Sequence, residues 1–153
     1  MQAPSSRSEL IAALDEAAAR AAATDADPKG VAPLILRILT AASATREVTD
    51  ALAGIAPARA LLRVTDAGDA IELRAGEGRM HAEAADVRGK GPKVDAAAST
   101  WLGLLGGTLR PWLAFTRGLV VCRAGLNELR WIQQVAERLQ RGYEAARAAE
   151  KPS

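Results

Sequence analysis

The chain has 153 residues, which is enough for one domain with a hydrophobic core. Apolar residues make up 49% of the chain and charged residues 25%, as in an ordinary globular protein, although many of the apolar residues are alanines. The formal net charge is only +2, and the basic and acidic residues are interspersed. This balance argues against a dedicated nucleic-acid-binding protein, which normally clusters its Lys and Arg residues.

The cysteine content and the N-terminal residues indicate a compartment. Cys122 is the single cysteine, so no disulfide can form within the chain and a reducing environment is compatible with it. The first eight residues contain no apolar signal core. The longest uncharged run, residues 96–109, is too short to span a bilayer. We therefore expect a cytoplasmic protein.

The N-terminal third has the periodicity of helices. Residues Ser6 to Glu9 form a capping-box pattern, which predicts a helix over residues 6–23 that begins with Ser6 as its cap. A second helix is predicted from about residue 32, and a third over residues 45–53. We expect residues 1–57 to form a helical extension packed on the remainder of the chain, so that the whole is a single compact unit.

From residue 58 the apolar period changes to two, which predicts strands. Three strands joined by tight turns are expected over residues 58–65, 70–74 and 79–84, with His81 on the solvent side of the third. Two more are expected over residues 93–97 and 119–123, and a long helix over residues 126–149.

The residues that usually carry chemistry are sparse. One His and one Cys cannot complete a four-ligand zinc site. The glycine-containing turns at residues 76–78 and 88–91 lack the spacing of a phosphate-binding loop. We therefore expect no catalytic residue, no cofactor and no metal, and we keep an enzyme that uses His81 or an arginine only as a third hypothesis.

The most informative segment is residues 94–125. It contains two short helical stretches separated by Gly106 and Gly107, and then an apolar strand. Between residues 101 and 115 it carries eight large apolar side chains, which either fill the core or line a cavity. Gly103, Gly106 and Gly107 favour the cavity, since they remove volume that a closed core would need.

This segment resembles the sterol carrier protein type 2 lipid-binding domains. The resemblance rests on a Gly-x-Leu-x-Pro-x-x-Ala-Phe-x-x-Gly pattern, whose positions here are Gly107, Leu109, Pro111, Ala114, Phe115 and Gly118. It implies that residues 58–149 are such a domain, with an α+β fold in which helices cover one face of a five-stranded, mostly antiparallel sheet. Here that fold would carry extra N-terminal helices and a long C-terminal helix.

The resemblance also implies a function. The expected activity is non-catalytic binding or transfer of a lipid or other long apolar molecule, in an apolar cavity between sheet and helices. The wall residues would be Trp101, Leu105, Leu109, Phe115, Ile132 and Val135. The alternative is an accessory protein-interaction module that assists a lipid or quinone biosynthesis enzyme. The expected partners are an apolar small molecule, together with a protein or a transient membrane contact.

Overall fold

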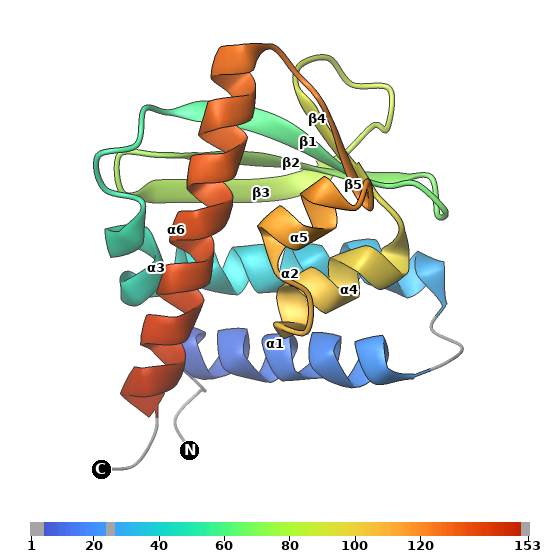
Figure 1. The fold of residues 1–153 in the computed structure, drawn as a ribbon. Coiled ribbons are helices and arrows are strands. Elements are labelled where there is room, and N and C mark those ends of the chain that lie inside the picture. Colours follow the sequence, from blue (N-terminus) through green and yellow to red (C-terminus); the bar gives the residue numbers. More distant parts are fainter. Residues whose placement is uncertain (1–4, 24–26, 151–153) are drawn as a thin grey trace.

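The computed structural model describes residues 5–23 and 27–150, and Figure 1 shows a sheet with helices on one side. The helices are α1 (Ser6–Ala22), α2 (Val31–Ser43), α3 (Arg46–Ala51), α4 (Ala98–Gly106), α5 (Pro111–Thr116) and α6 (Leu126–Glu150), with a 3-10 turn η1 (Pro28–Gly30) before α2. The strands are β1 (Ala58–Val64), β2 (Asp69–Gly76), β3 (Arg79–Ala85), β4 (Lys93–Ala96) and β5 (Val120–Arg123). None of the helices in the described ranges is long and apolar enough to cross a membrane.

The five strands lie in the order β3-β2-β1-β4-β5. The β1–β2, β2–β3 and β4–β5 pairs are antiparallel, whereas β1 and β4 are parallel. The chain therefore forms a β1–β2–β3 meander and then crosses it, so that β4 pairs with the free edge of β1. This arrangement confirms the expected α+β fold with a five-stranded, mostly antiparallel sheet and a long C-terminal helix.

The two faces of the sheet differ in chemistry, because alternate residues of a strand point to opposite sides. The helix-facing side contributes buried apolar residues such as Val64 and Ile71 to the hydrophobic core. The outer side carries charged residues, among them Glu72 and Asp95. His81 lies on this outer side with 68% of its side chain exposed, which confirms its predicted orientation.

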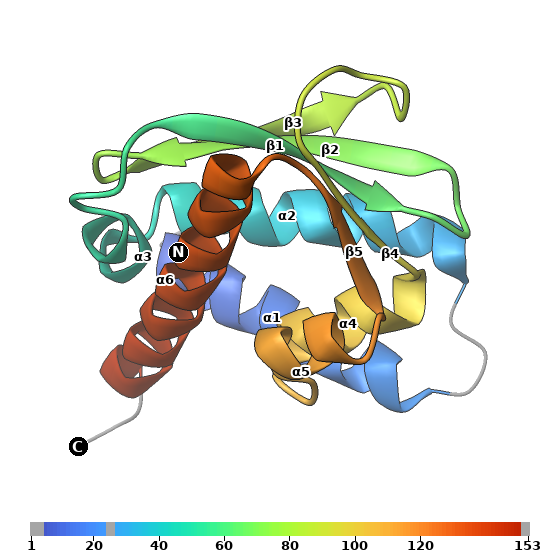
Figure 2. The same ribbon diagram turned by 45° about the horizontal axis from the view of Figure 1, so that its top comes forward.

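Helix α2 lies between the sheet and α1, as Figures 1 and 2 show. It contacts β2 and β3 on one side and α1 on the other. Its large apolar residues Ile35 and Ile38 are at most 1% exposed, so this helix forms the centre of the core. Core residues come from both predicted parts of the chain, 1–57 and 58–149. The division at residue 57 stays a prediction.

The first helix differs from the prediction at its cap. Ser5, not Ser6, is the N-cap residue, and its Oγ accepts a hydrogen bond from the Ser8 backbone N–H at 3.1 Å. The capping-box pattern placed the cap one residue too late, because Ser5 and Ser6 offer the same hydroxyl and only the backbone conformation distinguishes them.

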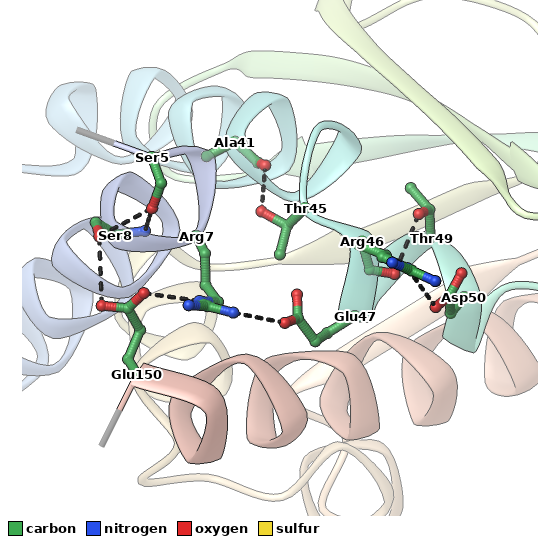
Figure 3. A network of polar contacts seen from close by, with 10 residues as sticks. All are labelled: Ser5, Arg7, Ser8, Ala41, Thr45, Arg46, Glu47, Thr49, Asp50 and Glu150. Atoms are coloured by element: carbon green, nitrogen blue, oxygen red, sulfur yellow. Dashed lines mark hydrogen bonds and ion pairs between the residues drawn. The ribbon is translucent and has the colours of Figure 1, made fainter. Parts of the chain in front are cut away.

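Helix α6 runs across the edge of the helical layer and contacts α3 and α1. Its Gly142 packs against α3 so closely that an added Cβ would lie 2.8 Å from the Val48 Cα. Near the end of α6, Arg7 of α1 donates hydrogen bonds to Glu150 at 2.7 Å and to Glu47 of α3 at 2.9 Å (Figure 3). These contacts fix the N-terminal helices to the C-terminal helix.

Candidate functional site

The candidate site begins with the turn between α4 and α5. Gly107 ends α4 in the left-handed conformation, with φ 82°, and the Leu109 backbone N–H donates back to the Gly103 carbonyl at 3.0 Å. Pro111 then occupies the first turn of α5, where its missing N–H costs nothing. The sequence therefore folds this segment into two short helices joined by a compact turn.

Gly106 has a different role from the predicted one. A Cβ at this position would lie 2.6 Å from the Ala18 Cα, so the glycine lets α4 approach the backbone of α1. Gly103 is also crowded, since its added Cβ would meet the Leu109 Cβ at 3.2 Å. These two glycines serve close packing, and they are not evidence for an internal hollow.

A cleft of about 550 Å³ lies between the α4–α5 turn and α6. Its apolar wall comes from three helices and the turn, and consists of Leu14, Leu105, Leu109, Pro111 and Trp112. The opposite side is the face of α6 that carries Glu137, Gln140, Arg141, Tyr143, Glu144 and Arg147. The cleft is thus apolar on one side and polar on the other, as a site for an amphipathic molecule would be.

The six predicted wall residues occupy four environments. Leu105 and Leu109 line the cleft. Trp101 and Val135 are buried in the core, where the Trp101 indole N–H donates to the Arg63 carbonyl at 2.9 Å. Ile132 is half-buried against the core. Phe115 is 39% exposed on α5, so the structure brings only two of the six together in the cleft.

Among the lining residues outside the predicted six are three large apolar or aromatic side chains, Trp112, Leu14 and Tyr143. Trp112 belongs to the apolar segment and lies three residues beyond Leu109, which is a signal that the sequence contained. Leu14 and Tyr143 come from the first and last helices. Their apolar stripes predicted burial, but no local pattern indicates which distant segment such a residue contacts.

An exposed apolar surface adjoins the cleft on α5. Trp112 is 64% exposed, and Phe115 lies one turn further along the same helix. Leu119, just after the helix, is 43% exposed. Residues 96–122 contain no Asp or Glu but include Arg110 and Arg117. This surface is therefore apolar and basic, whereas the rest of the protein mixes both charges.

A second hollow, of about 840 Å³, lies at one end of the outer face of the sheet. It is shallow, and its lining includes Arg59, Arg74, Arg79 and His81. Glu72 forms ion pairs with Arg59 and with Arg74, at 3.7 Å and 2.7 Å, so two of these arginines are already engaged. A shallow, charged surface of this kind is unsuited to a long apolar molecule.

The remaining groups that could carry chemistry are not arranged for nucleophilic attack or metal binding. Cys122 is half-buried, and burial together with the nearby Asp95 carboxylate raises the pKa of its thiol, which disfavours the nucleophilic thiolate. In residues 5–23 and 27–150 no group of three His, Cys, Asp or Glu side chains is placed to hold a metal ion. The clearest binding feature is therefore the cleft.

Comparisons with known proteins give matches at the level of structure. No family model matches the chain, and no curated protein matches it. Among solved structures, a stereoselective inverting sec-alkylsulfatase from a Pseudomonas species matches 69% of this chain with 15% identity and a TM-score of 0.53. That match covers only 16% of the sulfatase chain, so it concerns a small part of the larger enzyme.

Two smaller proteins match over most of their length. A conserved hypothetical protein from Thermus thermophilus, described as possibly a sterol carrier protein, is 25% identical over 73% of this chain and 88% of its own, with a TM-score of 0.48. Sterol carrier protein 2 is 20% identical over 86% of this chain and 95% of its own, with a TM-score of 0.47. In structure, this chain is thus similar to one protein described as possibly a sterol carrier protein and to sterol carrier protein 2.

Proposed function

We propose that the chain binds a lipid or another long apolar molecule, without catalysis, in the cleft between the α4–α5 turn and α6. The observation that carries the proposal is the apolar wall of this cleft, to which Leu105, Leu109 and Trp112 contribute. A volume of about 550 Å³ suits a single alkyl chain or a small apolar ring system. The resemblance of residues 107–118 to the lipid-binding domains supports the same function.

Binding of a long apolar ligand needs few hydrogen bonds or ion pairs with the protein. Each methylene that leaves water contributes about 0.8 kcal/mol. A chain of a dozen methylenes therefore gains roughly 10 kcal/mol, which exceeds the lower estimates of the cost of association. This is why a binding protein of this kind needs neither a metal nor a catalytic group.

The exposed surface of α5 suggests how such a ligand reaches the cleft. Trp112 is both a lining residue of the cleft and the most exposed tryptophan of the described chain. Aromatic and aliphatic side chains flanked by arginines favour the interface of a bilayer with anionic lipids. We propose a transient membrane contact through Trp112, Phe115 and Leu119, next to the mouth of the cleft.

The binding site can be tested with Leu109→Gln. The full chain and the variant are titrated with the fluorescent apolar probe N-phenyl-naphthylamine. Because a polar amide replaces part of the apolar wall, we expect the variant to bind about tenfold more weakly. The matched control is Leu126→Gln, since Leu126 is 66% exposed and lies outside the cleft. Equal affinity of the Leu109 variant and the unmodified chain contradicts the assignment of the site.

The exposed α5 surface also favours the second candidate, an accessory role beside a lipid or quinone biosynthesis enzyme. The two roles differ in what touches residue 112. A photo-crosslinking amino acid at this position, introduced in cells, should form lipid adducts if the surface meets membranes. A single stoichiometric protein adduct supports the accessory role instead.

A further inference from the structure

Tyr143 carries a buried, unsatisfied hydroxyl beside the cleft. It is the single tyrosine of the chain, lies on α6, and is only 6% exposed. It lines the cleft, and its hydroxyl has no hydrogen-bond partner among the described residues. Neighbouring polar groups are engaged elsewhere: the Gln140 Nε2 donates to the Leu104 carbonyl at 3.3 Å, and Arg147 pairs with Asp15 at 2.9 Å.

A buried hydroxyl without a partner destabilises the protein that carries it. Such a group has lost its water without gaining a hydrogen bond, and buried tyrosines normally find a partner. Burial also raises the pKa of the Tyr143 hydroxyl, so the group keeps its proton under physiological conditions and remains a hydrogen-bond donor. A ligand that brings an acceptor atom to this position would recover the missing hydrogen bond.

The surroundings indicate what kind of acceptor fits. The apolar wall beside Tyr143 includes Leu14 and Leu105. A carboxylate or phosphate that moved in among these leucines would lose its water, at a cost far above that of a neutral oxygen. The charged lining residues have both signs, with Glu137 and Glu144 beside Arg110, Arg141 and Arg147, and Arg147 is already paired with Asp15. They therefore give no net preference for an anion.

We infer that the Tyr143 hydroxyl donates a hydrogen bond to a neutral oxygen, of a ketone, ester or alcohol, at the polar end of an otherwise apolar ligand in the cleft. This inference rests on the proposed function and makes it more specific. The chain length of the ligand would set its affinity, and Tyr143 would select for the oxygen and fix which end lies deepest.

The test compares two ligands that differ only at one end. Methyl decyl ketone and the terminal alkene of equal carbon number are used to displace N-phenyl-naphthylamine from the full chain and from Tyr143→Phe. We expect the variant to lose about three- to tenfold in affinity for the ketone and nothing for the alkene. Its thermal midpoint should equal or exceed that of the unmodified protein, since no hydrogen bond within the protein is removed.

Other outcomes overturn the inference in distinguishable ways. An equal loss for both ligands means that the ring packs against the chain and the hydroxyl recognises nothing. A lower thermal midpoint of Tyr143→Phe means that the hydroxyl already has a partner in the free protein. If dodecanoate binds more tightly than the ketone, and if its affinity depends more strongly on Tyr143, the head group of the ligand is anionic.

The proposed function and this inference can fail separately. If neither ligand binds the unmodified chain, the proposed function itself fails. If both ligands bind and Tyr143→Phe changes neither affinity, only this inference fails.

Discussion

Helices α2 and α5 are both rich in large apolar residues, but these residues are buried in α2 and exposed in α5. In α2, Leu34, Ile35 and Ile38 are at most 2% exposed. In α5, Trp112 and Phe115 are 64% and 39% exposed. The difference lies in their neighbours, since α2 is enclosed by α1 and the sheet whereas α5, with six residues, contacts β5. An apolar composition alone therefore does not bury a helix. The fold must also place another helix or the sheet against each apolar side of it.

The same contrast extends to the sheet. Helix α2 covers β2 and β3, where Leu73 and Met80 are buried in the core. In strands β1 and β5, the helix-facing residues Leu62, Val120 and Cys122 pack against the core but stay partly exposed. The molecule thus has a closed half, which supplies stability, and a more open half around β5, α5 and α6, which contains the proposed binding cleft.

The closed half should show the largest response to truncation. Ile38 has no exposed surface, so Ile38→Ala leaves a cavity as well as losing apolar contacts. We expect it to lower the free energy of unfolding by about 2–5 kcal/mol, measured by urea denaturation. The matched change in the open half is Phe115→Ala, for which we expect a loss of about 1 kcal/mol or less. If Phe115→Ala costs as much as Ile38→Ala, the division into closed and open halves is wrong.

The sequence predicted the closed half well, because its signals are local. The 3.6-residue period of α1 and α2 and the two-residue period of β1 to β3 each arise from one element with one buried face. The Gly106-Gly107 break likewise placed the end of α4 correctly, and the flanking Leu105 and Leu109 do reach the cleft.

Which residues line the cleft depends on contacts between distant segments, and no local sequence pattern predicts such contacts. Leu14 and Tyr143 are 129 positions apart and meet only because α1 and α6 pack together. Trp101, Leu105 and Val135 were all named as wall residues through the family resemblance, and all three are apolar residues at helical spacing. Such spacing identifies the inward face of a helix, but it does not show whether that face meets the core or a cleft.

An ion-pair cluster on the outer face stabilises the open half of the sheet. Asp95 of β4 accepts hydrogen bonds from the Arg63 Nε at 2.5 Å and from the Arg123 Nε of edge strand β5 at 3.0 Å. The Arg63 hydrogen bond, and to a lesser degree that of Arg123, lowers the pKa of the Asp95 carboxyl. We expect Asp95→Asn to lower the free energy of unfolding at neutral pH by about 1–3 kcal/mol, because it leaves Arg63 without its partner.

The pH dependence of this effect follows from the direction of the pKa shift. A carboxyl whose pKa is lower in the folded protein contributes its full stability above its unfolded pKa, near 3.9, and loses it as the pH falls through the folded value. The difference between the unmodified protein and Asp95→Asn, measured by urea denaturation, should therefore shrink below about pH 4. Asp50→Asn serves as the control, since the Asp50 side chain is 72% exposed and should contribute little at any pH. A difference that persists unchanged in acid contradicts the role of the Asp95 charge.

The smallest effect on stability, and the sharpest test of the open half, is expected from Trp112→Ser. Because Trp112 is largely exposed, the free energy of unfolding should change by about 0.5 kcal/mol or less. Sedimentation with vesicles that contain anionic phospholipid should nevertheless fall severalfold, since the indole no longer enters the bilayer interface. Leu126→Ser is the matched control, because Leu126 is equally exposed but lies at the start of α6, outside residues 110–119. Equal vesicle binding by both variants would mean that α5 is not the membrane contact. A large loss of stability in Trp112→Ser would mean that its exposed surface is covered by a contact within the protein, and that α5 belongs to the closed half after all.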